Sequence, residues 1–351
     1  MELRTLGGTG IKVSTLCLGA MMFGPWGNDD RDECVRMIHR ALDGGINFID
    51  TADVYGAGES ERVVGAALAS AGAGRRDDIV VATKFHSRMG DDPNRSGNSR
   101  RWIMRACEES LRRLQTDWID LYQAHRPDPS CDVDETLSAL SDLVHQGKVR
   151  AIGSSTFPAD KIVEAQWVAE RRGHERFRCE QPPYSILVRG VEAAVLPACQ
   201  DYGMGVIAWS PLAGGWLTGK YRRGEEPPAG SRMVRGRIPD RFNLAKPENQ
   251  RKLDIVEELA KVAADAGRSM THLSVAWVLN HPAVTSAIVG PRTPEQLDDL
   301  LALGAAEDGL RLDSAVLDRI DQLVPPGRTI NPADDGYKPP ALADASLRRR
   351  R

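Results

Sequence analysis

Residues 46–84, INFIDTADVYGAGESERVVGAALASAGAGRRDDIVVATK, begin with one short apolar run and end with another. Short continuous apolar runs rich in Val and Ile are typical of strands that are buried on both faces. The ends of the two runs lie about 30 residues apart, which is the length of one strand–helix–strand unit. This stretch therefore predicts two parallel strands joined by a crossover segment.

The same rhythm continues in both directions along the chain. The strand-like runs are STLCLG (14–19), INFID (46–50), IVVATK (79–84), IDLYQAH (119–125), VRAIGSS (149–155), FRCEQ (177–181), VIAWS (206–210) and SAIVG (286–290). Between them, apolar residues recur at three- and four-residue intervals, as in amphipathic helices, over 29–45, 99–115, 132–148 and 158–172. Strand–helix units repeated in this way favour an α/β fold, a closed (β/α)₈ TIM barrel. Before the first unit, two short runs around a Gly-rich turn predict an N-terminal β-hairpin.

A doubly wound open sheet is the competing architecture. It is disfavoured because no G-x-G-x-x-G follows the first strand, where a dinucleotide-binding sheet needs glycines. We expect a single barrel domain over 1–330 and a tail over 331–351 that ends in four arginines. Two long loops, 86–99 and roughly 221–250, follow the third and seventh strands, at the C-terminal mouth where barrel enzymes build their sites.

Composition excludes several classes of protein. The 351 residues carry a net charge of −3, which gives no basic excess for nucleic acid or an anionic membrane. No secretory signal and no apolar run of about 18 residues is present, so we expect no membrane partner. The six cysteines form no C-x-x-C pair, and we expect reduced thiols in a cytoplasmic protein. Since no His/Cys cluster has zinc-ligand spacing, we expect no metal.

Four polar residues interrupt the ends of consecutive strands. Asp50 ends the second run, Lys84 the third and His125 the fourth, while Tyr55 stands in the turn after Asp50. Each has an ordinary structural explanation: a turn residue, a solvated lysine, a structural histidine or a rim aromatic. In a barrel, however, the ends of these strands are adjacent, so the four side chains are expected to converge at the mouth.

Together these residues form an acid catalyst. The Tyr55 phenol, with an ordinary pKa near 10, can give a proton to a forming alkoxide. A neighbouring Lys84 ammonium is expected to lower the pKa of Tyr55, and Asp50 to hold Lys84 charged and in place. His125 is expected to hydrogen-bond the carbonyl oxygen and orient the substrate. Because no side chain supplies a hydride, reduction requires a nicotinamide cofactor.

At this point the sequence resembles the aldo-keto reductase superfamily over nearly its whole length. The matching stretches are GGINFIDTADVYGAGESERVVGAAL (44–68), LRRLQTDWIDLYQAHRPDP (111–129), GKVRAIGSSTF (147–157), AWSPLAGGWLTGKY (208–221) and IVGPRTPEQLDDLL (288–301). It is most similar to the bacterial branch related to potassium-channel β subunits. The resemblance implies NADPH-dependent reduction of an aldehyde or ketone to an alcohol, with Tyr55 as general acid assisted by Lys84, Asp50 and His125.

The resemblance also implies positions for NADPH/NADP⁺. On the nicotinamide and its ribose it places Ala20, Met21, Asp50, Ser155, Thr156 and Gln181. Along the pyrophosphate it places Trp209, Ser210, Pro211, Leu212, Lys220 and Arg232, and near the adenosine Gly290, Arg292, Gln296 and Asp299. Two positions depart from the usual pattern. Thr156 stands where relatives commonly carry Asn or Arg, and Leu300 stands where many carry Asn.

The choice of NADP(H) over NAD(H) has a physical basis in the sequence. Thr293 and Pro294 are typical of a helix N-cap and first turn, and a helix N-terminus attracts anions. Arg292 precedes them, and a guanidinium suits the paired oxygens of a phosphate. This combination favours a cofactor with a 2′-phosphate.

Substrate contacts are expected from Phe23, Trp26, His86 and Arg126, all in loops near the mouth. Small aldehydes, ketones and nucleotide-linked keto-sugars all stay open as substrates, and oligomeric state and direction in the cell leave no local signature. Other readings of the chain are a Schiff-base aldolase that uses Lys84, which Asp50 disfavours by keeping the amine charged, and a regulatory NADPH-binding subunit or redox sensor with little turnover. Gly214–Lys220 fits G-x-x-x-x-G-K, but Tyr221 replaces the Ser/Thr that a P-loop needs for magnesium.

Overall fold

A computed structural model describes residues 1–72, 74–235 and 239–350, and it contains a closed barrel of parallel strands. Each strand pairs with its neighbours in chain order, and the last pairs with the first through Ala287 and Leu16. The strands are β3 (Leu16–Gly19), β4 (Phe48–Asp50), β5 (Val80–Phe85), β6 (Ile119–Ala124), β7 (Val149–Ser155), β8 (Cys179–Gln181), β9 (Gly205–Ala208) and β10 (Val284–Val289). The predicted barrel is confirmed, and the open sheet is wrong.

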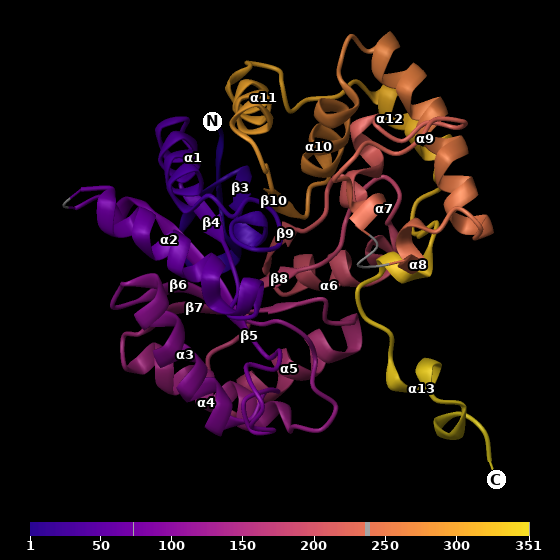
Figure 1. Ribbon diagram of the computed structural model, residues 1–351. Coiled ribbons are helices and arrows are strands. Elements are labelled where there is room, and N and C mark those ends of the chain that lie inside the picture. The colour runs from indigo at the N-terminus through magenta and orange to yellow at the C-terminus, as the bar shows by residue number, and fades with distance from the viewer. Residues whose placement is uncertain (73, 236–238, 351) are drawn as a thin grey trace.

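Helices surround the barrel on its outside (Figure 1). Several of them begin at a side-chain cap, where Asp30, Ser99, Asp132, Ser269 and Thr293 accept from backbone N–H groups. The helices are α1 (Arg31–Asp43), α2 (Glu59–Ser70), α3 (Arg100–Leu114), α4 (Val133–His145), α5 (Ala159–Arg172), α6 (Val195–Asp201), α7 (Arg232–Arg235), α8 (Pro239–Phe242), α9 (Pro247–Asp265), α10 (Met270–Asn280), α11 (Pro294–Ala305), α12 (Ser314–Leu323) and α13 (Pro340–Ala343).

The predicted N-terminal hairpin plugs the bottom of the barrel. Strands β1 (Leu3–Thr5) and β2 (Lys12–Ser14) pair antiparallel, and Leu6 in the turn between them is fully buried among the inward-facing residues of the barrel strands. Gly7 sits against the start of β9, where a Cβ would lie 2.5 Å from the backbone N of Gly205. Its φ of +51° also falls in the left-handed region that glycine tolerates. Access to the barrel interior is therefore from the opposite end.

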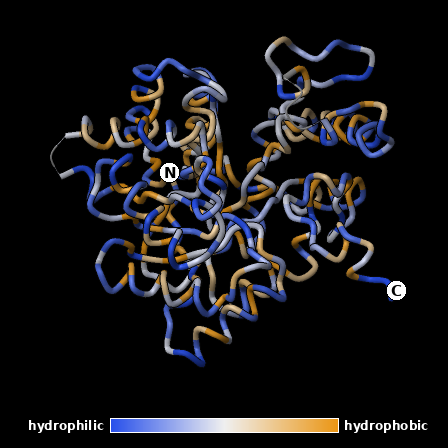
Figure 2. The backbone as a smooth tube through the Cα atoms, turned by 60° about the horizontal axis from the view of Figure 1, so that its bottom comes forward, coloured by the Kyte–Doolittle hydropathy of each residue, from blue (hydrophilic) through white to orange (hydrophobic). Residues whose placement is uncertain are grey.

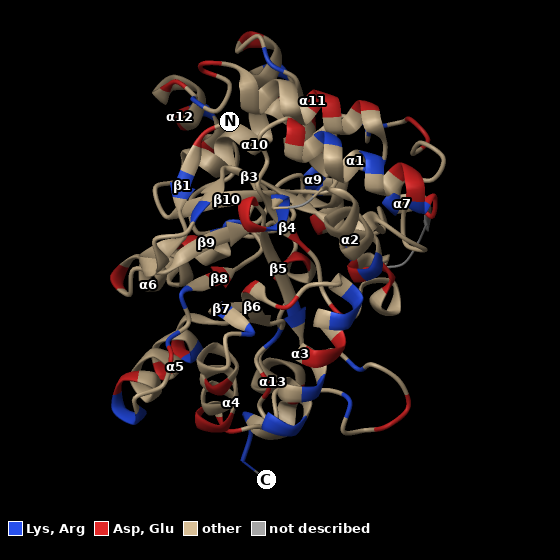
Figure 3. Cartoon of the chain, turned by 90° about the vertical axis from the view of Figure 1, so that its left-hand side faces the viewer, with Lys and Arg blue, Asp and Glu red and all other residues tan. Residues whose placement is uncertain are grey.

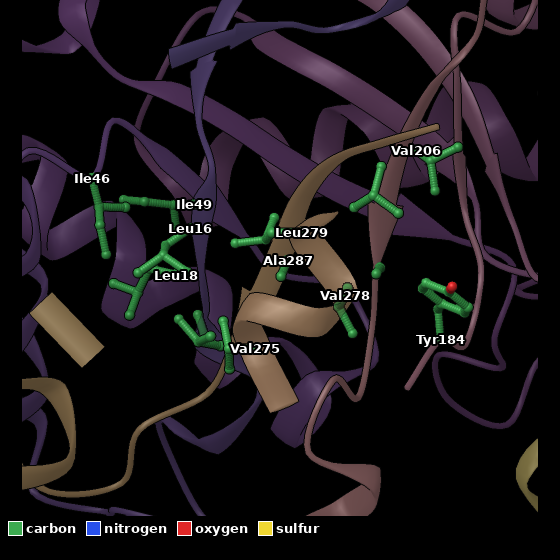
Figure 4. Close-up of a cluster of buried hydrophobic side chains, with 14 of the residues drawn as sticks. Leu16, Leu18, Ile46, Ile49, Tyr184, Val206, Val275, Val278, Leu279 and Ala287 are labelled. Carbon is green, nitrogen blue, oxygen red and sulfur yellow. The ribbon is translucent and has the colours of Figure 1, made fainter. Parts of the chain in front are cut away.

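The core has two parts, inside the barrel and between barrel and helices. The inner cluster includes Cys17, Phe48, Leu121 and Ile207, which come from β3, β4, β6 and β9. The larger outer cluster lies under the helices, and Figure 4 shows a part of it, where side chains of β3 and β4 meet those of α10 and β10. Figure 2 shows the resulting pattern along the chain, in which apolar and polar stretches alternate at short intervals.

The segment after residue 330 begins inside the fold and then leaves it. Asn331 and Asp334 are buried, and Asp334 forms ion pairs with Arg241 and, at 2.5 Å, with the Nζ of Lys252. The compact part of the chain therefore continues beyond residue 330. Helix α13 and the described residues after it, up to 350, project away from the barrel (Figure 1).

Within the described residues, no helix combines the length and apolarity needed to cross a membrane.

Candidate active site

The four polar residues at consecutive strand ends lie at one end of the barrel. Asp50 is the last residue of β4, Lys84 is the penultimate residue of β5, and His125 follows β6 directly. Because the strands are parallel, their carboxyl ends meet at the same mouth. Tyr55 enters the same space from a 3₁₀ turn, Tyr55–Gly58, that connects β4 to α2.

A chain of short polar contacts links three of these residues. The Lys84 Nζ lies 2.6 Å from the Asp50 Oδ2 and 3.4 Å from the Tyr55 hydroxyl, and it donates a further bond of 2.7 Å to the carbonyl of Thr51. The second Asp50 oxygen accepts from the Gln181 Nε2 at 2.8 Å. Lys84 is fully buried, so these partners fix its position without help from water.

His125 stands on the other side of the tyrosine. The ring centroids of Tyr55 and His125 are 5.7 Å apart at an angle of 80°, an edge-to-face arrangement. The His125 Nδ1 has no hydrogen-bond partner in the described structure, and the ring is buried. Burial lowers the pKa of His125 well below its ordinary value, and the charges of Lys84 and Arg126 lower it further. The imidazole is therefore neutral at physiological pH and carries one N–H donor.

Burial and neighbouring groups together set the pKa values of Tyr55 and Lys84. Burial raises the pKa of Tyr55, and although Lys84 acts in the opposite sense, the net direction is upward. The predicted net lowering of the Tyr55 pKa is thus wrong, because removal of water from the phenol outweighs the ammonium. Burial disfavours the charged form of Lys84, but Asp50 and Tyr55 outweigh it and the pKa of Lys84 is raised. At neutral pH Tyr55 is therefore a phenol and Lys84 an ammonium.

The turn that carries Tyr55 depends on the glycine after it. Gly56 has a φ of +58°, and a Cβ there would lie 3.0 Å from Pro25. Ala57 also adopts a positive φ, +55°, which is costly for a residue with a Cβ. The turn keeps the phenol at the mouth and brings the Trp26 ring to 5.9 Å from the Tyr55 ring.

A cavity of about 560 Å³ opens beside Tyr55 and His125 and runs along the ends of β7 to β10. Such a volume lies in the range of sites for small molecules and cofactors. The predicted site residues that line it are Met21, Asp50, Tyr55, His125, Arg126, Ser155, Gln181, Trp209, Ser210, Pro211, Leu212, Lys220, Arg232, Gly290, Arg292, Gln296 and Asp299.

Six other predicted residues lie outside the cavity lining. Lys84 lies beneath Tyr55, and Trp26 lies beside it. Ala20 and Phe23 are both buried in the outer core cluster. The Nδ1 of His86 is 2.9 Å from the Asn98 side-chain oxygen, and Thr156 accepts from the indole of Trp209 at 3.3 Å. The structure thus brings the catalytic set and most of the cofactor set together, but not all of the substrate set.

Positive charges gather at the end of the cavity remote from Tyr55. Burial lowers the pKa of Lys220, and the charges of Arg292 and Arg232 lower it further, which places the three cations near one another. Helix α11 begins at Pro294, and its N-cap Thr293 accepts from the Gln296 N–H, as predicted. Arg292 is the residue before this N-cap. A group of like charges beside a helix N-terminus fits an anionic ligand such as a phosphate.

Sequence reasoning missed three charged residues around the site. Asp53 is fully buried, and neither of its carboxylate oxygens has a hydrogen-bond partner among the described residues; burial raises its pKa, and Glu61 raises it further. Glu180, between Cys179 and Gln181 in β8, points to the outside of the barrel and has a pKa raised by burial to about 7. Arg241, in the long 221–250 connection, lines the cavity. Asp53 and Glu180 lie within the stretches 44–68 and 177–181 that the sequence analysis singles out, whereas no local signal identifies Arg241.

The G-x-x-x-x-G-K segment takes no P-loop form. It follows β9 as a 3₁₀ segment, Ala213–Thr218, in which Gly214 and Gly215 have positive φ. Residues 236–238 of the neighbouring long connection lie outside the described part of the chain. Among the described residues, no group of three or more His, Cys, Asp or Glu side chains could hold a metal ion.

Comparison with known proteins agrees with this geometry. The profile of the aldo/keto reductase family matches residues 15–325. The chain is 40% identical over 334 residues to "Uncharacterized oxidoreductase YrpG" of Bacillus subtilis, with 93% of this chain and 96% of that protein aligned. It is 36% identical to "Aldo-keto reductase YhdN" of Bacillus subtilis, over 86% and 88% of the two chains. It is 35% identical to "Putative voltage-gated potassium channel subunit beta" of Schizosaccharomyces pombe, over 92% of both.

The family match covers most of the chain, and the closed barrel with a polar cluster at its mouth agrees with it. The chain belongs to the aldo/keto reductase family.

Proposed function

We propose that this chain is an NADPH-dependent reductase that converts an aldehyde or ketone to an alcohol, with Tyr55 as the proton donor. The observation that carries the proposal is the linked set of Tyr55, Lys84 and Asp50 at the mouth of a cavity whose far end is cationic. Catalysis by a placed acid requires a group that is protonated at working pH and touches the reacting oxygen. The raised pKa of Tyr55 meets the first condition, and its position in the cavity lining supports the second.

In this mechanism the protein polarises the carbonyl and supplies the proton. The substrate oxygen accepts hydrogen bonds from the Tyr55 hydroxyl and from the neutral His125 ring. As negative charge develops on that oxygen, the Tyr55 proton moves to it, and the Lys84 ammonium stabilises the phenolate that forms. Asp50 keeps Lys84 charged and receives no proton itself. Water then returns a proton to Tyr55.

The residues around the cavity fit a nicotinamide cofactor. Gln181 and Ser155 stand at the catalytic end, with Gln181 fixed by its bond to Asp50 and Ser155 donating to the Gln181 carbonyl at 2.9 Å. The cationic group of Lys220, Arg232 and Arg292 would hold phosphates, with Arg292 at the 2′-phosphate that distinguishes NADPH from NADH. When bound, the reduced cofactor supplies the hydride that adds to the carbonyl carbon, and it leaves as NADP⁺.

The proposal assigns the remaining roles as follows. Met21, Asp50, Trp209, Ser210, Pro211, Leu212, Gly290, Gln296 and Asp299 line the cofactor path, and Trp26 and Arg126 contact the substrate. The expected cytoplasmic location is supported by the cysteines, all of which are free thiols in the structure. The partner is then a small carbonyl compound rather than a macromolecule.

A regulatory NADPH-binding subunit or redox sensor with little turnover is the second candidate function. The similarity to proteins named as potassium-channel β subunits favours it, because that similarity covers 92% of this chain. The complete set of Asp50, Tyr55, Lys84 and His125 favours turnover instead.

One assay separates the two candidates. NADPH oxidation is followed by absorbance with a panel of aldehydes and ketones, for the native chain and for Tyr55→Phe. Loss of the acid is expected to lower kcat/KM by about 10²–10⁴-fold, with NADPH affinity unchanged and NADPH bound more tightly than NADH. Tyr202→Phe, at a half-exposed tyrosine after α6, is the matched control and is expected to behave as native. Tight NADPH binding without turnover of any carbonyl would establish the sensor, and equal activity of Tyr55→Phe and native would refute the assigned acid.

A further inference from the structure

Among the described residues, one positively charged side chain that lines the cavity has no role in binding the proposed cofactor and no ion pair within the protein. Five Lys and Arg residues line the cavity among the described residues. Three of them, Lys220, Arg232 and Arg292, form the cationic group at the far end. A fourth, Arg241, is buried in an ion pair with Asp334. The fifth is Arg126, which lies at the catalytic end.

Arg126 is held at this end by its backbone rather than by an acid. It follows His125 directly, and its Nη1 donates to the His125 carbonyl at 2.5 Å. Its own carbonyl accepts from the Asn98 Nδ2 at 3.0 Å. In the described structure no carboxylate oxygen lies within 4.0 Å of its guanidinium, whereas many of the other arginines form such pairs. A guanidinium has five N–H donors, so most of the donors of Arg126 have no acceptor among the residues that the structure describes.

Glu180, the carboxyl group that acts on the charge of Arg126, is not positioned to neutralise it. Glu180 is fully buried behind the strands, where its oxygens accept from the Ser154 hydroxyl and the Phe157 N–H. Burial raises the pKa of Glu180 to about 7, so a substantial part of it is uncharged at neutral pH. Arg126 is partly buried in the cavity wall, and a partly desolvated cation without a counter-ion is unfavourable unless a ligand supplies one.

The charge of Arg126 reaches the reacting groups. It contributes, after burial and Lys84, to the low pKa of His125, and it is among the charges that act on Tyr55. An anion bound by Arg126 therefore lies close to the carbonyl that Tyr55 and His125 polarise. The guanidinium edge formed by Nε and Nη2 is not used by the bond to His125, and its two N–H groups match the paired oxygens of a carboxylate.

We propose that the preferred substrates are carbonyl compounds that also carry a carboxylate, and that Arg126 is the residue that binds this carboxylate. The inference rests on the proposed function, because it names the substrate class of the same site. The carboxylate replaces the missing counter-ion, and the Arg126 charge offsets the repulsion between that carboxylate and the alkoxide that forms at the carbonyl oxygen.

The test uses two pairs of aldehydes of matched shape, 3-formylbenzoate with 3-formylbenzamide and 4-formylbenzoate with 4-formylbenzamide. With the native, NADPH-saturated protein, at least one acid is expected to have a kcat/KM about tenfold or more above that of its amide, as for a hydrogen bond to a charged group. Arg126→Gln is expected to abolish this preference by lowering kcat/KM for the acid far more than for the amide, and Arg126→Lys to restore part of it. Arg101→Gln, at an exposed arginine of α3, is the control and keeps the preference.

The outcomes separate the inference from the proposed function. Equal kcat/KM for acid and amide in the native protein, or an equal loss for both in Arg126→Gln, overturns the inference while the reductase assignment stands. If none of the four aldehydes is reduced, binding to the NADP⁺-loaded protein, which cannot reduce them, is measured by calorimetry. Tighter binding of an acid that disappears in Arg126→Gln then supports the anion site without the reductase, and binding that is equal for acid and amide overturns it.

Discussion

At the scale of single residues, the contact between Asp50 and Lys84 places a full charge pair inside the barrel mouth. Both side chains are at most 4% exposed, and the two oxygens of Asp50 are occupied by Lys84 and Gln181. A buried pair of this kind contributes little net stability against an apolar pair, but loss of one partner leaves the other charge unpaired. The pair is therefore retained for its position beside Tyr55, and its removal has two separable effects.

Asp50→Asn is expected to lower the free energy of unfolding by about 3–5 kcal/mol, because Lys84 stays buried without its counter-ion. Urea denaturation monitored by circular dichroism measures the change. Asp43→Asn, which breaks the exposed pair with Arg75, is the matched control and is expected to have little effect. The double variant Asp50→Asn/Lys84→Met is expected to recover stability but not reductase activity. Equal stability of Asp50→Asn and the native chain would contradict the burial of the pair.

Glu180 gives a pH dependence whose direction follows from its raised pKa. Its ordinary value is 4.5 and its value in the folded chain is about 7. Below pH 4.5 both the folded and the unfolded chain hold the proton, and between 4.5 and 7 only the folded chain holds it. The stability that this group contributes is therefore fully present below pH 4.5 and is lost as pH rises through 7, by about 3 kcal/mol at 1.36 kcal/mol per pKa unit.

Glu180→Gln removes this titration while keeping a similar shape. The unfolding free energy of the variant, relative to native, is expected to increase by about 3 kcal/mol between pH 4.5 and pH 8. Denaturant melts of both chains across that range check it. Glu164→Gln, at an exposed glutamate of α5 paired with Lys161, serves as control and is expected to give a flat difference. A flat difference for Glu180→Gln as well would show that the carboxyl titrates normally.

At the scale of elements, the hairpin at the bottom of the barrel depends on the close approach of two glycines. A Cβ at Gly7 would lie 2.5 Å from the Gly205 N and 2.7 Å from the Arg178 carbonyl. The turn also has φ of +51° at this position, so substitution there combines backbone strain with a clash.

Gly7→Ala is expected to destabilise the chain by clearly more than Gly10→Ala. At Gly10, φ is +78° but nothing lies within 4 Å of a Cβ, so only the conformational cost of about 1–2 kcal/mol applies. Thermal unfolding of the two variants and the native chain gives the comparison. The same loss in both variants would mean that the hairpin does not press on β9.

The elements also show how far sequence reasoning extends. The strand at 149–155 and the helix cap at Thr293 follow from local patterns, and both are present at the predicted residues. The strand runs at 46–50 and 206–210 are longer than β4 and β9, because only the hydrogen-bonded part of an apolar run forms the ladder.

Long-range contacts escaped prediction for a physical reason. The position of Arg241 depends on its ion pair with Asp334, which is 93 residues away along the chain. The pKa of Tyr55 depends on how much water the folded chain excludes, a quantity that the order of residues does not encode locally. The convergence of Asp50, Tyr55, Lys84 and His125 was accessible because barrel topology alone brings the ends of adjacent strands together.

At the scale of the whole molecule, the end of the chain divides into an anchored and a free part. The 3₁₀ turn Pro332–Asp334 carries Asp334 into a buried cluster with Arg241 and Lys252, while α13 and the final arginines project outward. Figure 3, viewed from the side of α1–α3, shows blue Lys and Arg residues in the segment that ends the described chain, below the barrel.

Removal of the free part alone and removal of both parts are expected to affect the stability of the chain differently. Among the described residues, truncation after Lys338 takes away side chains of which none is buried and nearly all are exposed, and it is expected to leave Tm nearly unchanged. Truncation after Ile330 removes Asp334, leaves two buried cations without their acid, and is expected to lower stability by several kcal/mol. Differential scanning calorimetry of both truncated chains is the measurement. Similar Tm values for the two would show that the buried cluster does not anchor this segment.

The closure of the barrel has a consequence for how the molecule forms. Leu16 pairs with Ala287, so the first and last strands of the ring are separated by most of the chain. During synthesis from the N-terminus, β3 has an unpaired edge until residue 289 has left the ribosome. Contacts of such large sequence separation slow folding and expose strand edges to association with other chains. A ribosome that stalls before β10 would therefore hold a nearly complete but open ring, the form of this protein most dependent on chaperones.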